Sequence, residues 1–192
     1  MPKQAESIPP CGGRRKSSHD SSQKPVARGH IIRRAMSLTI PRAILYGGLT
    51  AGTLDLVDAF VFFGLRSGAK PVPILHSIAA GLIGRDAARA GGTPTAILGL
   101  LTHFLVAFCI VAVYVLASRA MPSLRKQWVL HGIAFGFVAY LVMTWFVVPM
   151  SNAGSGSISF ALPVMPIMIN GILIHALAVG LPAAFFASRI RP

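Results

Sequence analysis

Acidic residues are scarce in this chain. Of its 192 residues only five are Asp or Glu, against 18 Lys or Arg, for a formal net charge of +13. Charged residues make up 12% of the sequence, whereas an ordinary soluble domain has about a quarter. Cysteine is equally rare, and Cys11 and Cys109 form neither a disulfide framework nor a metal-binding spacing. These absences argue against a soluble globular domain and a disulfide-stapled secreted one.

Motifs of common enzyme and metal sites are also missing. No Walker loop, nucleophile elbow or HExxH zinc motif occurs, and no HxxxH or ExxH pattern supplies metal ligands. We therefore expect no enzymatic activity, no metal and no cofactor. The basic residues form no face with interleaved aromatics, so we also expect no nucleic-acid partner.

Hydrophobic residues are what the chain has in abundance, at 54% of the sequence and a mean hydropathy of +0.66. They fall into four blocks, each long enough for a helix that crosses a bilayer, which needs about 20 residues. We predict an all-α membrane protein with a four-transmembrane-helix bundle in residues 39–192. The predicted spans cover about residues 43–65, 95–117, 129–150 and 162–186. Pro163, Pro166 and Pro182 predict a kinked fourth helix.

A shorter helix is predicted over residues 74–90, between the first two spans. Its apolar part is too short to cross a bilayer, and Ile74, Ile78 and Leu82 share one helical face. We expect this helix to be amphipathic and interfacial, or to re-enter the bilayer without crossing it.

Residues 1–38 are basic, rich in Ser, Pro and Gly, and without hydrophobic periodicity, which predicts a disordered cytoplasmic tail. Met36 is an alternative start, because the apolar region begins just after it. With the N-terminus inside, 14 Lys and Arg residues fall on the cytoplasmic side and four on the outer side. The positive-inside rule therefore predicts a multi-pass protein with both termini in the cytoplasm. We expect the tail to bind anionic lipid headgroups.

Every predicted span carries polar side chains. At 1.5 Å per residue, they are expected to lie within about 6 Å of the bilayer midplane, in one layer. They are Asp55 and Asp58 in the first span, His103 in the second, Tyr140 in the third, and Asn170 and His175 in the fourth. An aspartate at such a depth costs roughly 2.5–3.5 kcal/mol, so we expect these groups to have partners or water.

Glycines lie on the same helical faces as these polar residues. Gly48 with Gly52, and Gly132 with Gly136, have the GxxxG spacing of closely packed membrane helices. The polar side chains are therefore expected to be buried inside the bundle. The glycine pairs can pack within the chain or between protomers of a homo-oligomer.

Two interpretations of this polar layer stay open. Histidine titrates near neutrality and apolar surroundings favour the neutral form of a carboxyl, so the layer can bind or relay protons. Alternatively, the protein is a structural or accessory membrane subunit, whose polar groups only hold helices together by hydrogen bonds worth roughly 0.6–2 kcal/mol each.

Residues 98–150, which include the stretch from "LLTHF" to "FVVPM", resemble the YagU-like family of bacterial inner-membrane proteins. The matching positions are Thr102, His103, Tyr114, Pro122, Trp128, Gly132, Met143 and Pro149. The resemblance implies a multi-pass protein of the bacterial inner membrane that is associated with acid resistance and has no known biochemical activity. The aspartate pair is not part of the resemblance, so its role is inferred from this sequence alone.

Overall fold

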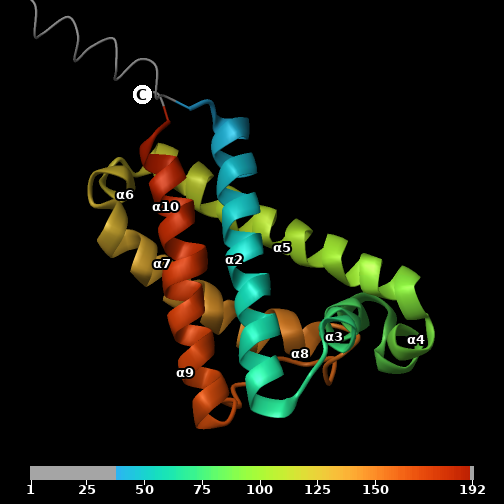
Figure 1. Ribbon diagram of the computed structural model, residues 1–192. Coiled ribbons are helices and arrows are strands. Elements are labelled where there is room, and N and C mark those ends of the chain that lie inside the picture. Colours follow the sequence, from blue (N-terminus) through green and yellow to red (C-terminus); the bar gives the residue numbers. More distant parts are fainter. Residues whose placement is uncertain (1–37, 191–192) are drawn as a thin grey trace, which may run out of the picture. The chain divides into compact units, whose positions relative to one another are not determined.

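The computed structural model describes residues 38–190, and within this range the chain is helical and contains no β-strand (Figure 1). The predictions for the basic tail, for Met36 and for Cys11 lie outside the described residues. The α-helices are α2 (Ile40–Ser67), α3 (Pro71–Ile83), α4 (Arg85–Ala90), α5 (Gly92–Ala120), α6 (Ser123–Lys126), α7 (Trp128–Val142), α8 (Val148–Met150), α9 (Met165–Ile174) and α10 (Leu181–Ser188). Two π-helical segments, η2 (Met143–Val147) and η3 (His175–Gly180), join α7 to α8 and α9 to α10.

Four helical stretches are long and apolar enough to cross a membrane. They are Ile40–Ser67, Gly92–Ala120, Trp128–Met150 and Met165–Ser188. The predicted all-α fold with four membrane-spanning helices, and a shorter helix between the first two, is thereby confirmed. Large apolar side chains such as Leu101 and Leu105 point outward and are 63% and 61% exposed, which indicates a lipid-facing surface.

Proline and glycine residues set the ends of the first span and the start of the fourth. Helix α2 starts with Pro41 in its first turn and ends at Gly68, whose left-handed φ of 67° closes the helix. The fourth span begins at Met165 and not at residue 162, because Pro166 occupies the first turn and residues 158–164 are not helical.

Each π-helical segment ends shortly before a proline. Pro149 follows η2 and Pro182 follows η3, and a proline has no N–H to donate to the carbonyl four residues earlier. Within η2, the Trp145 carbonyl, which Pro149 cannot serve as a donor, accepts a hydrogen bond from the Ser159 backbone N–H at 3.1 Å. That bond ties the connection between the third and fourth spans back onto the third.

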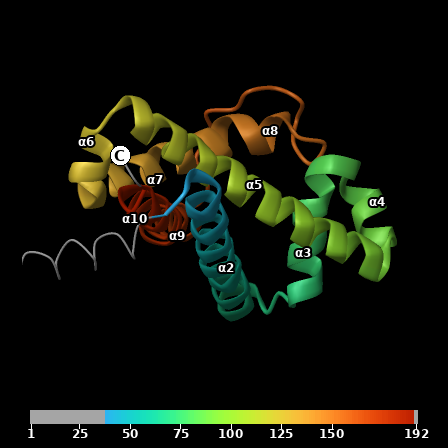
Figure 2. The same cartoon turned by 90° about the horizontal axis from the view of Figure 1, so that it is seen from above.

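The helix predicted over residues 74–90 is two helices. Gly84 separates α3 from α4 with φ 83° and ψ 161°, a conformation that residues with side chains rarely adopt. Helix α3 packs against α5, which crosses the molecule obliquely from α6 to α4 (Figure 2). With its 13 residues, α3 is about 20 Å long, too short to span a bilayer.

Both glycine pairs pack against helices of the same chain. A methyl group on Gly52 would lie 2.8 Å from the Phe104 ring of α5, and one on Gly132 would lie 3.0 Å from the Gly180 carbonyl oxygen. Gly48 likewise faces Phe108 of α5, and Gly136 faces the backbone of η3. The two GxxxG faces therefore join α2 to α5 and α7 to the fourth span, and are not left open to a second protomer.

Candidate functional site

Asp55 lies on α2 with a histidine on each side, and each histidine comes from a different span. Its Oδ2 atom is 4.0 Å from His103 Nε2 on α5, and its Oδ1 atom is 4.0 Å from His175 Nδ1 at the start of η3. Both distances are longer than a hydrogen bond, which needs about 2.7–3.2 Å. The structure thus places two of the other five predicted polar residues beside the Asp55 carboxyl group.

The backbone determines which nitrogen of each histidine carries a hydrogen. His103 Nε2 donates to the Gly52 carbonyl at 2.8 Å, and His175 Nδ1 donates to the Gly171 carbonyl at 3.0 Å. A carbonyl oxygen only accepts, so these two nitrogens are the protonated ones in the neutral rings. The other nitrogen of each ring is then the one that can take up a proton and make the imidazole cationic beside Asp55.

Asp58 has a different partner from Asp55, although the two are one helical turn apart. Asn170 Nδ2, on α9, donates a hydrogen bond to Asp58 Oδ2 at 2.7 Å. This bond links the first and fourth spans. The two aspartates therefore serve separate contacts, one with histidines and one with an amide.

Tyr140 is the buried member of the set, with 5% of its surface exposed. Its ring meets the His175 ring edge to face, at 5.6 Å between centroids. Gly171 makes room for this contact, since a methyl group there would lie 3.1 Å from Tyr140 Cδ2. The Tyr140 hydroxyl is buried and has no hydrogen-bond partner among the described residues.

The structure gives a half-buried layer in place of the buried one that the sequence predicts. The side chains of Asp55, His175 and His103 are 24%, 18% and 13% exposed, and Asp58 and Asn170 are also half-buried. Helix α7 packs mainly on η3 and α10, whereas α2 packs mainly on α5, α10 and η3, so the third span contributes little to covering α2. No charged side chain within residues 38–190 is fully buried.

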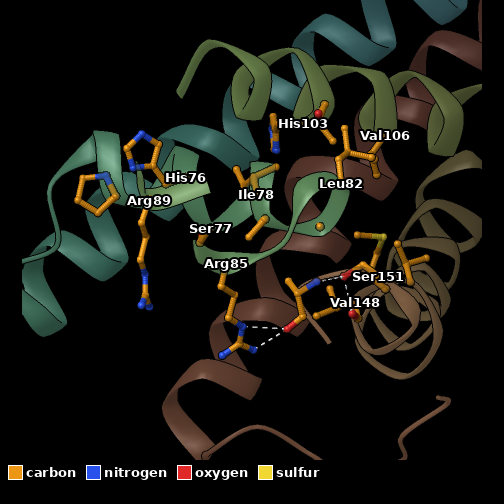
Figure 3. A pocket seen from close by; sticks show the side chains of 17 residues that line it. His76, Ser77, Ile78, Leu82, Arg85, Arg89, His103, Val106, Val148 and Ser151 are labelled. Carbon is orange, nitrogen blue, oxygen red and sulfur yellow. Dashed lines mark hydrogen bonds between the residues drawn. The ribbon is translucent and has the colours of Figure 1, made fainter. Parts of the chain in front are cut away.

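His103 also lines a pocket of about 990 Å³, and Asp55 is not among the residues of its wall (Figure 3). Its walls come from α3, α4, α5, η2, α8 and the segment after α8. Figure 3 shows His103 on one side of this space, with Arg85 and Arg89 on the other. Sequence reasoning missed the pocket because its walls are far apart along the chain and no motif joins them. His76 also lies in this wall and donates from Nε2 to the Gly92 carbonyl at 2.8 Å.

No group of three or more His, Cys, Asp or Glu side chains with metal-binding geometry occurs in the described part of the chain. Comparisons of the chain with protein-family models, with curated proteins and with solved structures find no match. The resemblance to the YagU-like family therefore stays a prediction. The function is inferred from the geometry of the site.

Proposed function

We propose that this protein is a multi-pass protein of the bacterial inner membrane that binds and relays protons through His103, Asp55 and His175. The observation that carries the proposal is the placement of one carboxyl 4.0 Å from two histidines of two other spans. A movement of about 1 Å at either contact brings the atoms within hydrogen-bond reach, where a proton can be transferred.

Three further features support a site for protons at this point. Each histidine keeps one ring nitrogen that makes no bond to the backbone, so each ring has a position that can accept a proton. The unpartnered hydroxyl of Tyr140 lies on the ring that meets His175, and a buried hydroxyl without a protein partner is expected to bond to water. His175 also begins a π-helical segment, a feature frequent at functional sites.

The physiological role that we propose is tolerance of acid or envelope stress. It is supported by the resemblance of residues 98–150 to the YagU-like family and requires no enzymatic step. We propose that both termini face the cytoplasm and that the basic tail binds anionic headgroups. Four helices leave little room for a pathway within one chain, so a conducting form is expected to be an oligomer. Such an oligomer would use faces other than the two glycine pairs, which are occupied within the chain.

Reconstitution tests the proposal. Liposomes that contain a pH-sensitive dye and the full chain should acidify faster than empty liposomes after an acid jump outside. Asp55→Asn should bring the rate down to that of empty liposomes, because it removes the group between the histidines. Asp58→Asn is the matched control, since Asp58 contacts Asn170 and should retain the wild-type rate. If wild-type and empty liposomes acidify equally, the relay is refuted.

A structural or accessory role is the second candidate, and the hydrogen bonds of the site favour it. Asn170 to Asp58 joins α9 to α2, and His103 to Gly52 joins α5 to α2. Bonds of this kind average about 0.6 kcal/mol between membrane helices. Under this role the Asp58→Asn variant loses thermal stability in detergent while neither aspartate variant changes proton flux. Equal stability of wild type and both variants would argue against it.

A further inference from the structure

The pocket beside α3 combines an apolar interior with basic residues at its edge. At about 990 Å³ it has the size of a small-molecule site, and it is partly open. The apolar side chains of its wall come from three separate segments of the chain. They include Ile78, Leu82, Val106, Met143, Val147 and Val148. The cationic side chains in the same wall are those of Arg85 and Arg89, both from α4.

The pocket lies at one end of the bundle. Helices α3 and α4 and the segment that follows α8 gather at the end opposite α6 (Figure 1). Because α3 is too short to cross a bilayer and follows directly after a span, this end corresponds to the membrane interface. At that depth the acyl chains of lipids meet their headgroups, so an apolar cavity with cations at its edge matches the chemistry of both.

The backbone positions one of the two arginines in advance. Arg85 donates from Nε and Nη2 to the Ala153 carbonyl, at 3.0 and 2.6 Å, which holds the guanidinium across the end of the pocket. A guanidinium has five N–H donors, so three remain for a ligand. Arg89 lies one turn later on the same face of α4 and is exposed. Within residues 38–190, neither arginine makes an ion pair with a carboxyl.

We propose that this pocket binds one anionic phospholipid from the adjoining leaflet, with an acyl chain against the apolar wall and the phosphate on Arg85 and Arg89. Charge complementarity favours this occupant, because the segment from residue 66 to residue 91 has four basic side chains and one acidic one. A soluble anion would leave the apolar wall unused. A zwitterionic lipid would bring no net charge to the arginines. The lipid site and the proton relay share His103, but the arginines proposed to hold the phosphate take no part in the relay.

Native mass spectrometry of the full chain in detergent tests this lipid site. Titration with phosphatidylglycerol should give one tightly bound lipid, and phosphatidylcholine with the same acyl chains should bind more weakly. Each arginine near a membrane surface is expected to contribute about fivefold in affinity. The double variant Arg85→Gln, Arg89→Gln should therefore lose about 25-fold in phosphatidylglycerol affinity. The control, Arg66→Gln with Lys70→Gln, removes two cations from the same segment but outside the pocket and should bind as wild type.

Arg89→Gln alone serves as the second variant, because Arg85 also holds the segment after α8 and its loss can disturb the fold. Its expected loss is about fivefold for phosphatidylglycerol, with no change for phosphatidylcholine. Soluble glycerol phosphate should not compete. Competition at equal concentration would mean a simple anion site and would overturn the proposal. Equal binding of the two lipids, or equal losses in the pocket and control variants, would mean nonspecific lipid contact and would overturn it as well.

Discussion

Replacing Gly136 by alanine is expected to force α7 away from η3. The added methyl group would lie 2.6 Å from Ala176 Cα and 2.7 Å from the His175 carbonyl carbon, whereas carbon atoms in contact are about 3.5–4.0 Å apart. The two segments must therefore separate by about 1 Å. Overpacking of this kind costs about 1–3 kcal/mol. The opposing atoms are backbone and cannot rotate away, so we expect a cost at the upper end.

Helix propensity offsets part of this cost, since alanine is about 1 kcal/mol better than glycine inside a helix. The net expected loss is about 2 kcal/mol, or a melting temperature lower by about 4–8 °C for a chain of this size. Thermal unfolding in detergent, followed by circular dichroism, measures the loss. Gly64→Ala is the matched control, because a methyl there meets nothing nearer than the Ala69 carbonyl oxygen at 3.7 Å.

The control should be as stable as wild type or slightly more so. Unfolding of Gly136→Ala at the same temperature as Gly64→Ala would refute the close approach of α7 to η3. His175 belongs to η3, so the same displacement is expected to change its 4.0 Å contact with Asp55. If the proposed relay operates, Gly136→Ala should then also slow the acidification of liposomes.

Three other changes test the site and its surroundings. Tyr140→Phe removes a buried hydroxyl that has no protein partner, so unfolding in detergent should show a stability within about 1 kcal/mol of wild type; a larger loss would reveal a protein partner. Asn170→Ala leaves Asp58 without its donor and should cost about 1 kcal/mol, while the same change made in an Asp58→Asn background should cost less. Cys109 is exposed on α5, toward lipid, so a lipid-soluble maleimide should label it and a membrane-impermeant one should not, as mass spectrometry would show.

Length and hydropathy were sufficient to predict the fold. A bilayer requires about 20 apolar residues per crossing, and four blocks of that length became the four spans. The boundaries were less predictable, because backbone effects that hydropathy does not report decide them. Gly84 divides the short helix in two, and Pro166 delays the fourth span. That the helix between the first two spans does not cross the bilayer was predictable from the short length of its apolar run.

The site was predictable in its residue types but not in its pairing. Depth along each span placed Asp55, His103 and His175 in one layer, and the structure has them in contact. Asp55 and Asp58 lie one helical turn apart on the same span, yet their partners differ. Which helices are neighbours decides those partners. The polar residues and glycines indicate which face of a span points inward, but not which other span that face meets. The packing of α7 on η3 could not be predicted for the same reason.

The π-helical segment η3 divides the fourth span into α9 and α10, whose side chains point in different directions around the helix axis than they would in one unbroken α-helix. A π turn holds one residue more than an α turn, so everything after it is rotated by roughly 100° relative to an unbroken helix. This rotation lets α9 present Asn170 to the first span while α10 turns Ala183 and Ala187 into the core. Deleting one residue between His175 and Gly180 would restore a regular α-helix. Either Asn170 would then no longer face the first span, or Ala183 and Ala187 would no longer face the core. The number of residues in this segment is thus as strongly constrained as their chemistry.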